Sequence, residues 1–591
     1  MSAERLEALR RQLRQQGADG FVLQRTDQHG SEHLPPGEER LAWLTGFTGS
    51  AGQAVVLQDK AAVFTDGRYT VQIAQEVAGD LFERCDSTAR PPSKWLEAEL
   101  QSGVVLGYDP KLTRKAERQT LERLCRNRGA TLRALDVDPI DAIWQDRPPP
   151  PLAPVVAHDE RHAGESSPAK RQRIGEQIAA AGADWLLVTA CDSIAWLLNI
   201  RGSDVPFNPL CLSHLLLAAD GSARWFVDPE KLEGEPVVDA TVETRGYAAI
   251  DDALDELGAA AARVLVDPTL NAVGFADRLA RAGARVVEAK DPIPLAKAKK
   301  NETEIEGALA AQRRDGAAVV RFLAWLDQQP LDGSLTEIDA AAHLHDERAR
   351  DPLFRGPSFE TISAHGPNAA LPHYRVSETS NRPLTAGTLY LVDSGGQYPD
   401  GTTDITRTIA LGQPTADMVL RFTLVLKGHI ALSEAIFPEG TAGGQLDMLA
   451  RQFLWRRGLD YDHGTGHGIG SYLCVHEGPQ RLAKRGGDTA LEAGMILSNE
   501  PGYYQPEAYG IRIENLVLVE AAPMPEGGER ALLCFRNLTL APIDRRLIDP
   551  HLLTEPERRW LDTYHARVLD ELSPLLDAPG KAWLERATAP L

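Results

Sequence analysis

The polar and apolar positions of this chain follow two periods, one typical of helices and one typical of strands. Apolar residues recur at helical spacing among charged ones before residue 17 and in 173–181, 301–326, 336–350 and 552–572. Short apolar runs occupy 21–23, 185–188, 389–393, 405–409 and 511–519. The pattern therefore predicts a chain that mixes helices and strands along its whole length.

The first half contains an internal repeat. A basic helix, the turn Gly17-Ala18-Asp19 and an apolar run at 21–23 are echoed by a helix, Gly182-Ala183-Asp184 and an apolar run at 185–188. A second echo pairs residues 41–44 (Leu-Ala-Trp-Leu) with residues 194–197 (Ile-Ala-Trp-Leu). Repeated helix-then-strand units predict two similar α/β domains in tandem.

Proline and polar residues mark the predicted domain limits. Pro148 to Pro151 and the polar stretch His158 to Ser167 predict a linker, and Ser167-Pro168 is expected to cap the next helix. Asn301 and Glu304 predict a capping box that opens a third unit. We expect domains at 1–155, 156–295 and 296–545, the third an α+β unit with a curved antiparallel sheet, and a helical extension at 546–591. Trp560 and Leu561 are expected to pack in the core.

Composition excludes several classes of protein. A length of 591 residues exceeds what one hydrophobic core usually supports. The 63 Lys and Arg residues against 84 Asp and Glu residues give a formal charge of −21, so we expect neither nucleic acid nor an anionic membrane as partner. No apolar run approaches the roughly 18 residues of a membrane span, and residues 1–16 lack a signal-peptide core. Together with six scattered cysteines, these features predict a cytoplasmic protein.

Five residues with metal-binding side chains follow one another in the second half: Asp393, Asp404, His467, Glu500 and Glu514. Carboxylates combined with one imidazole suit hard to borderline divalent ions, and bridging carboxylates can hold a pair of them. A metal pair makes hydroxide from water at neutral pH. The set therefore indicates a metallohydrolase.

The sequence around Asp393 and Asp404 gives only weak evidence for a metal site. Asp393 ends one apolar run and Asp404 begins another after the turn Pro399-Asp400-Gly401, which predicts a hairpin. Opposed side chains on such a hairpin lie about 5 Å apart, so the two aspartates could meet across the ladder. Taken alone, both also fit ordinary turn and strand-edge positions.

The remaining candidates have more unusual surroundings. Residues 463–470 (His-Gly-Thr-Gly-His-Gly-Ile-Gly) alternate glycines in a way that permits a close backbone approach but does not match a dinucleotide fingerprint. Glu500 lies in an Asn-Glu-Pro-Gly turn, and Glu514 lies inside the apolar strand predicted at 511–519. A carboxylate buried in such a strand needs a partner, and a metal ion can supply one.

Seven short motifs lie in the second half of the chain: residues 373–375 (HYR), 392–396 (VDSGG), 403–408 (TDITRT), 463–470 (HGTGHGIG), 475–479 (VHEGP), 499–502 (NEPG) and 512–515 (RIEN). They resemble the metal-site motifs of the pita-bread metallopeptidases, and of the long three-domain form of aminopeptidase P in particular. The resemblance extends to Thr65 to Tyr69 and Arg201 to Asp204. It implies two tandem creatinase-type α/β domains followed by a pita-bread catalytic domain.

The resemblance also implies a role for each ligand. Asp393 would bind one metal, Asp404 and Glu514 would bridge both, and His467 and Glu500 would bind the second. The implied cofactor is a pair of Mn²⁺ ions. Zn²⁺ or Co²⁺ remain open because the Irving–Williams order favours them.

The resemblance implies a catalytic set around these ligands. Glu500 would be the general base and His476 a donor to the developing oxyanion. His373 and His463 would orient the peptide around proline, and Arg512 would steady the ligating carboxylates. The implied reaction is hydrolysis by metal-activated hydroxide of the bond between an N-terminal residue and a penultimate proline, in a homodimer.

Two other functions fit the same scaffold. One is a prolidase that cuts only Xaa-Pro dipeptides, and the other is a non-catalytic, peptide-binding pita-bread module, whose signature is loss of ligands. His343 and His345 are two apart on a predicted helix and are expected outside the site, as is the loop residue His365. Cys474 is expected to be a buried apolar thiol.

Overall fold

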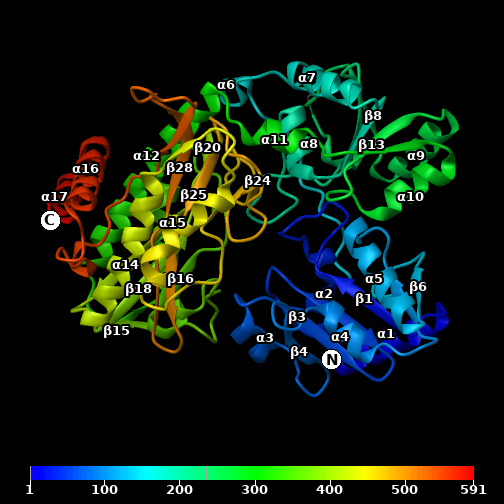
Figure 1. Cartoon of the computed structure of the whole chain (residues 1–591), viewed down its shortest axis with the longest axis horizontal. Coiled ribbons are helices and arrows are strands. Elements are labelled where there is room, and N and C mark those ends of the chain that lie inside the picture. The colour runs from blue at the N-terminus through cyan, green and yellow to red at the C-terminus, as the bar shows by residue number, and fades with distance from the viewer. Residues whose placement is uncertain (1, 235) are drawn as a thin grey trace. The chain divides into compact units, whose positions relative to one another are not determined.

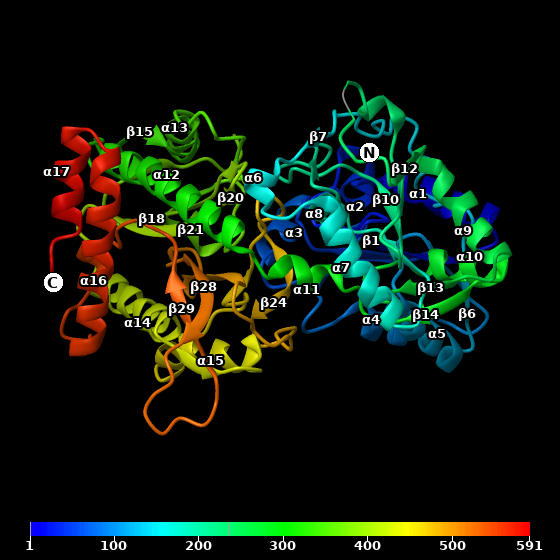
Figure 2. The same cartoon turned by 90° about the horizontal axis from the view of Figure 1, so that it is seen from above.

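The computed structural model describes residues 2–234 and 236–591. Its compact units are Met1–His158 with Glu165–Ile293, here called unit 1, and Asp159–Gly164 with Pro294–Leu591, here called unit 2. Figures 1 and 2 show the mixture of helices and strands in both. Within the described residues, no helix combines the length and the apolarity that a membrane crossing requires.

Unit 1 contains two six-stranded sheets of the same topology. The first has the order β4-β3-β2-β1-β5-β6 and the second has the order β12-β11-β10-β8-β13-β14. In each sheet the second, third and fourth strands of this order pair antiparallel with one another, and the other neighbouring pairs are parallel. The strands are β1 Gly20–Gln24, β2 Gln53–Leu57, β3 Ala61–Thr65, β4 Glu83–Asp86, β5 Val105–Tyr108, β6 Thr131–Ala134, β8 Trp185–Val188, β10 His214–Ala218, β11 Ala223–Phe226, β12 Val242–Arg245, β13 Arg263–Val266 and β14 Arg285–Glu288. The predicted tandem α/β repeat is confirmed.

The helices of unit 1 follow the same repeat. Helix α1 leads into β1 as α7 leads into β8, and the paired Trp motifs lie on α2 and α8. The helices are α1 Ser2–Gln15, α2 Arg40–Thr45, α3 Thr70–Glu76, α4 Pro92–Glu99, α5 Lys115–Arg128, α7 Ser167–Ala180, α8 Cys191–Leu198, α9 Ile250–Ala259 and α10 Val273–Ala282. A two-stranded ladder pairs β7 (Val156–Ala157) with β9 (Ile200–Arg201).

The segment predicted as a linker contains a short helix, and the cap of the next helix is one residue earlier than expected. Ser166, one residue earlier than expected, caps α7 by accepting the Ala169 N–H at 3.3 Å. The polar stretch before it contains helix α6 (Glu160–Ala163), whose Ala163 carbonyl accepts a hydrogen bond from Asn301 at 2.8 Å. The polar composition therefore indicated a connecting segment, but part of this segment is helical. The domain limits at 155, 295 and 545 stay predictions.

Unit 2 is built on antiparallel sheets. One sheet has the order β16-β18-β21 and a larger one has the order β22-β29-β28-β25-β23-β24. The smaller ladders are β15-β17, β19-β20 and β26-β27. The strands are β15 Asp332–Thr336, β16 Ile362–His365, β17 Pro383–Thr385, β18 Thr388–Ser394, β19 Gln397–Tyr398, β20 Gly401–Thr402, β21 Ile405–Leu411, β22 Ile436–Pro438, β23 Gly466–Gly468, β24 Glu477–Leu482, β25 Ile496–Asn499, β26 Gly502–Gln505, β27 Tyr509–Arg512, β28 Asn515–Ala522 and β29 Leu532–Asn537.

Helices cover the strands of unit 2 on two sides. Figure 2 shows α12 and α13 on one side of the strands and α14 and α15 on the other. The helices are α11 Ile293–Ala298, α12 Glu302–Leu326, α13 Glu337–Ala349, α14 Ala416–Ser433, α15 Gly443–Trp455, α16 Glu555–Leu572 and α17 Ala578–Ala587. The capping box predicted at Asn301 and Glu304 is confirmed at the start of α12.

The C-terminal extension packs into the main core of unit 2. Leu561, Tyr564 and Val568 of α16 are buried with Phe422 and Leu426 of α14. Trp560 is partly buried against the same cluster, so the core role expected for Trp560 and Leu561 is confirmed. Helix α16 begins later than predicted because Thr554 and Glu557 form a capping box in front of it.

Candidate metal centre

The hairpin that carries the two aspartates has an offset register. β18 and β21 pair antiparallel as predicted, but Asp393 lies opposite Thr406 and not opposite Asp404. Asp404 directly precedes β21, so the two aspartates are diagonal neighbours on one face. A Cβ at Gly395 would lie 1.9 Å from the Thr403 carbonyl oxygen, so only glycine permits this crossing.

Glu514 lies at a break between strands and not inside one. The predicted strand at 511–519 divides into β27, which ends at Arg512, and β28, which begins at Asn515. At the break, the Glu514 N–H donates to the Thr406 carbonyl at 3.2 Å, and the Thr406 hydroxyl donates to Glu514 Oε2 at 2.7 Å. The interruption turns the Glu514 carboxylate towards β21.

His467 lies on the short strand β23 between two tightly packed glycines. A Cβ at Gly466 would lie 2.0 Å from the Ser498 carbonyl oxygen, which explains the glycine-rich sequence. His467 Nε2 lies 3.5 Å from Asp404 Oδ2 and 3.5 Å from Glu500 Oε1. One ligand atom each from Asp404, His467 and Glu514 lie within 4.8 Å of one another.

Glu500 follows the end of β25 and faces the same place. Its N–H donates to the Thr465 carbonyl at 2.8 Å, and the Ser498 hydroxyl donates to Glu500 Oε1 at 3.1 Å. The Ser498 hydroxyl also accepts the His467 N–H at 3.0 Å. The loop between β25 and β26 thus positions an acid beside the imidazole.

A buried hydrogen-bonded chain supports Asp393. Arg512 Nη2 donates to Asp393 Oδ2 at 2.5 Å, its Nε donates to the Thr406 hydroxyl at 3.0 Å, and its Nη1 donates to the Tyr504 hydroxyl at 2.6 Å. His463 Nε2 lies 2.8 Å from the same Tyr504 oxygen. Arg512 therefore links three strands to one carboxylate.

Burial and mutual repulsion oppose ionisation of these acids. Burial, followed by the nearby carboxylates, raises the pKa of Asp404 and of Glu514 well above the ordinary range. Burial, opposed by Arg512, raises the pKa of Glu500 to about 7. Asp393 Oδ1 is buried without a hydrogen-bond partner. Clustered acids and an orphaned carboxylate oxygen fit a site for divalent cations.

The predicted outer histidines lie at different distances from this centre. The His476 ring meets the His467 ring edge to face, with centroids 4.3 Å apart. His463 is connected to the centre through Tyr504 and Arg512. His373 is half-buried in the turn after the short 3₁₀ helix η4 (Gly366–Ala370), which packs against β27 at Gly510.

The histidines expected outside the centre do lie elsewhere. His343 stacks on Trp325 with ring centroids 3.8 Å apart, and His365 Nε2 lies 3.2 Å from the Thr385 carbonyl oxygen. His345 meets Phe354 edge to face. The expectation for Cys474 was wrong, because this residue is only partly buried.

Sequence reasoning missed three supporting residues. Thr406, Ser498 and Tyr504 bind the candidate ligands or Arg512. Thr406 lies within the TDITRT string, and Tyr504 lies two residues beyond the NEPG string. Their closeness to these motifs was the sequence feature that could have identified them. Burial raises the pKa of the Tyr504 hydroxyl to about 12, so it is a neutral link near pH 7.

Family comparisons match nearly all of the chain. Residues 306–521 match metallopeptidase family M24, and residues 531–591 match the C-terminal region of peptidase M24. Residues 5–142 and 146–304 each match a creatinase/prolidase N-terminal domain. The fold class predicted from the sequence is confirmed.

Individual relatives are similar over the whole length. The chain is 37% identical to a probable Xaa-Pro aminopeptidase P of Paracoccidioides brasiliensis, covering 100% of this chain and 99% of the relative. It is 39% identical to aminopeptidase P2 of Arabidopsis thaliana, covering 100% and 88%. A solved X-prolyl aminopeptidase of Caenorhabditis elegans, described as a cytosolic enzyme with a di-nuclear active site, superposes with a TM-score of 0.93 at 35% identity and covers 100% of both chains. This chain therefore belongs to the aminopeptidase P group of metallopeptidase family M24.

Proposed function

We propose that this enzyme is a metalloaminopeptidase that hydrolyses the bond between an N-terminal residue and a penultimate proline. The main support is that ligand atoms of Asp404, His467 and Glu514 lie close together. Glu500 lies beside His467. Support for the substrate comes from relatives named Xaa-Pro aminopeptidase P and X-prolyl aminopeptidase. A non-catalytic module is disfavoured because the ligand set is complete.

Five residues are proposed to hold two divalent cations. Asp393 would bind one ion, Asp404 and Glu514 both ions, and His467 and Glu500 the second. The oxygen-rich donor set favours Mn²⁺, with Zn²⁺ or Co²⁺ as alternatives. When bound, such a pair provides a nucleophile from water at neutral pH and polarises a carbonyl oxygen.

The side chains around the ligands have proposed roles in moving protons and holding substrate. Glu500, oriented by the Ser498 hydroxyl, would take a proton from water and pass it to the leaving proline nitrogen. His476 would donate to the developing oxyanion. Arg512 and Tyr504 would keep Asp393 in place.

Proline at the second position makes a dedicated enzyme necessary. Its ring nitrogen carries no N–H and its φ angle is fixed, so a site that requires that donor cannot bind it well. His373 and His463 are proposed to orient the peptide around this ring. The hydrogen bond between His463 and Tyr504 would hold one of these imidazoles in place.

The test compares peptide length and metal dependence in one assay. The metal-free enzyme is incubated with a bradykinin-like Arg-Pro-Pro peptide, a Gly-Pro peptide and an Xaa-Pro dipeptide, before and after return of Mn²⁺. We expect release of the first residue from the longer peptides only after metal return. Cleavage of dipeptides alone would replace the proposal with a prolidase.

The variant Asp404→Ala tests whether activity is lost while the protein stays folded. Turnover should fall by more than roughly 100-fold, because a proposed bridging ligand is removed, while the far-ultraviolet circular dichroism stays unchanged. Asp462→Ala is the control, since Asp462 is exposed and is not a proposed ligand. Unchanged turnover in the Asp404 variant would contradict the bridging role.

Location and assembly are proposed separately. We propose a cytoplasmic enzyme, because the solved relative is described as cytosolic. The homodimer implied by the resemblance stays a prediction, and light scattering after size exclusion tests it.

A further inference from the structure

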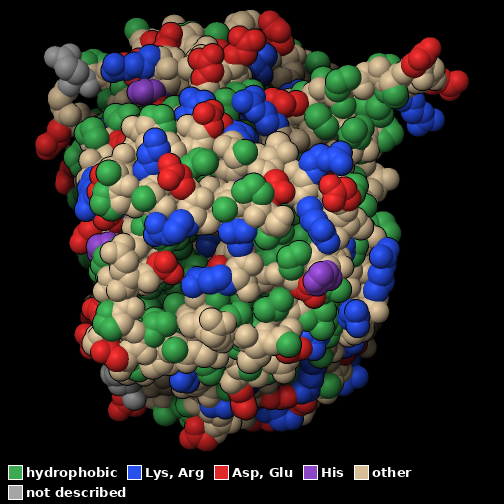
Figure 3. All heavy atoms as spheres, turned by 90° about the vertical axis from the view of Figure 1, so that its left-hand side faces the viewer, with side chains coloured by type: hydrophobic (Ala, Val, Ile, Leu, Met, Phe, Trp, Pro, Cys, Tyr) green, Lys and Arg blue, Asp and Glu red, His purple; other side chains and the backbone are tan. Residues whose placement is uncertain are grey.

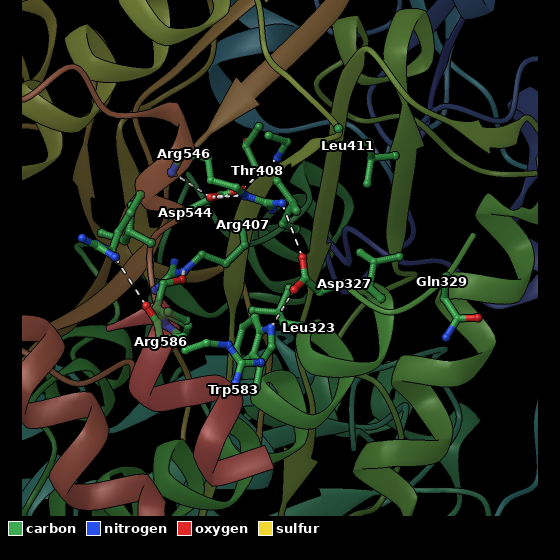
Figure 4. Close-up of a pocket in the computed structure, with 18 of the residues that line it drawn as sticks. Leu323, Asp327, Gln329, Arg407, Thr408, Leu411, Asp544, Arg546, Trp583 and Arg586 are labelled. Carbon is green, nitrogen blue, oxygen red and sulfur yellow. Dashed lines mark hydrogen bonds and ion pairs between the residues drawn. The ribbon is translucent and has the colours of Figure 1, made fainter. Parts of the chain in front are cut away.

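A cavity lies in unit 2, away from the candidate metal ligands. It has a volume of about 470 Å³ and lies among the C-terminal end of α12, β21, the 3₁₀ helix η5 (Arg545–Leu547) and α17 (Figure 4). None of the five candidate metal ligands lines it. Its volume falls within the range of about 300–1,000 Å³ that is usual for small-molecule sites.

The wall of the cavity is largely apolar. The apolar lining residues are Leu323 and Leu326 of α12, Ile409 of β21, Trp583 of α17, and Ile543, which precedes η5. The indole N–H of Trp583 donates to Asp327 Oδ2 at 3.2 Å, which holds the ring against the cavity. Such a wall favours an apolar ligand body of aliphatic or aromatic character.

The charged groups of the cavity are predominantly positive. Four arginines line it against two aspartates, which gives a formal charge of +2: Arg407, Arg545, Arg546, Arg586, Asp327 and Asp544. Arg546 pairs with both acids, at 2.8 Å from Asp544 Oδ2 and 3.4 Å from Asp327 Oδ1. Figure 3 shows a hollow with Lys and Arg side chains at its border on the face that carries α17.

The other three arginines donate to neutral groups. Arg407 bonds to carbonyl oxygens, the Asn515 side chain and the Tyr564 hydroxyl. Arg545 donates to the Pro590 carbonyl at 2.7 Å, and Arg586 donates to the Ala582 carbonyl at 3.0 Å. Across residues 2–234 and 236–591, none of the three forms an ion pair with an acid. Their charge is therefore available to attract an anion.

We propose that this cavity binds a small amphipathic carboxylate, with its apolar body against Leu326, Ile409 and Trp583 and its acid group towards Arg545 and Arg586. Arg407 contributes its charge from the buried end, because its donors are already used. The exposed Arg586 has spare donors at the opening. The binding proposal does not rest on the proposed peptidase function.

The cavity is also connected to the strand that follows Asp404. The Ala410 N–H of β21 donates to Asp544 Oδ2 at 2.9 Å. Arg407 Nη1 holds the Thr406 carbonyl at 2.9 Å and the Glu514 carbonyl at 2.7 Å. A ligand that packs on Arg407 and Ile409 is thus expected to reduce local unfolding of β21. Because β21 follows Asp404, this would connect the cavity to the metal centre and allow regulation.

The binding test uses the full chain and 4-phenylbutanoate as probe in titration calorimetry. We expect saturable binding of one molecule per chain. The alcohol 4-phenylbutan-1-ol has the same apolar body without the charge and should bind at least about fivefold more weakly. Equal binding of the alcohol, or no saturable binding of the acid, would overturn the proposal.

Two variants test whether the probe binds in this cavity. Leu331→Trp fills the space from the lining and should reduce affinity at least about tenfold. Arg586→Glu reverses one charge at the opening and should reduce it about fivefold. The matched controls are Leu575→Trp and Arg559→Glu, at exposed positions that do not line the cavity, and both should bind the probe normally. Unchanged affinity in Leu331→Trp would refute the location.

Hydrogen exchange tests the connection to β21 without measuring activity. The probe should slow exchange of the backbone amides in 405–411 and 543–547, and this protection should be absent in Leu331→Trp. Protection confined to other segments would refute the connection.

Discussion

Asp404 is the residue at which metal binding and stability conflict most directly. It is 3% exposed, and burial together with Glu514, Asp393 and Glu500 raises its pKa well above the ordinary range. Four carboxylates clustered beside one imidazole are tolerable only with added positive charge. The cluster should therefore stabilise the protein with metal and destabilise it without.

The variant Asp404→Asn tests this conflict. A carboxyl whose pKa is raised on folding leaves the protein most stable below the unfolded pKa near 4, and stability is lost as pH rises through the folded pKa. Metal-free Asp404→Asn should lack this term and melt at a higher temperature than metal-free wild type at pH 8, with the difference shrinking towards pH 4. Its activity should fall by more than roughly 100-fold. A lower melting temperature of the metal-free variant at pH 8 would contradict the repulsion.

At the scale of elements, a buried ion triad holds β24 to the segment that precedes α12. Glu477 Oε2 accepts from Lys297 at 2.6 Å and Glu477 Oε1 accepts from Lys300 at 2.5 Å. All three side chains are at most 2% exposed. Glu477 directly follows His476, so the triad also fixes the proposed oxyanion donor.

Glu477→Gln should therefore destabilise unit 2 strongly. Removal of one partner of a buried ion pair costs about 3–5 kcal/mol, because the remaining charges are left uncompensated. Urea unfolding measures the loss. Lys299→Met is the control, since its pair with Glu492 is 43% exposed on both sides and should cost less than about 1 kcal/mol. Similar losses in both variants would show that the triad has no special role.

Helix α16 contributes a pH dependence through His565. This imidazole is 1% exposed and accepts the Ile543 N–H at 3.1 Å. Burial, followed by Arg407 and Arg545, lowers the pKa of His565 to about 3. The unfolded chain binds a proton near pH 6.5 that the folded chain does not, so stability is lost as pH falls from about 6.5 towards 3.

His565→Gln should reduce the slope of this acid limb by the contribution of one histidine. The wild type should lose about 1.4 kcal/mol per pH unit from this residue below pH 6.5, and the variant should not. Unfolding free energies at pH 7, 6 and 5 measure the slope. His551→Gln, at an exposed position before the same helix, should keep the wild-type slope. An unchanged slope in His565→Gln would mean that the helix opens to water on acidification.

At the scale of the whole molecule, the candidate metal ligands are confined to one of the two compact units. All five candidate ligands belong to unit 2, and unit 1 has its own hydrophobic cores. Ligands stabilise only the structure to which they bind. Calorimetry should thus resolve a transition that responds to metal from one that does not.

We expect added Mn²⁺ to raise only the unfolding transition of unit 2. At 100 times the dissociation constant, the gain is about 2.7 kcal/mol. Asp404→Asn should respond much less, which assigns the shift to the proposed site. Equal shifts of both transitions would instead show that the units unfold together.

The sequence alone predicted much of the fold because the signals were local. The helix after Asn301 follows from its capping box, and the tandem domains follow from the repeated helix, turn and strand. The order of Asp393, Asp404, His467, Glu500 and Glu514 and their motifs indicated a metal centre. Side-chain type and motif context were sufficient for these inferences.

Only the tertiary structure decided how these residues meet. The break at Glu514, the diagonal register of Asp393 and Asp404, and the supporting roles of Tyr504 and Ser498 depend on contacts between segments far apart in the chain. Arg407 is similarly defined by partners more than 100 positions away. Local patterns specify which residues can ionise, bind or turn, but distances and burial arise only when separate strands pack together, and these set the charge and geometry of the site.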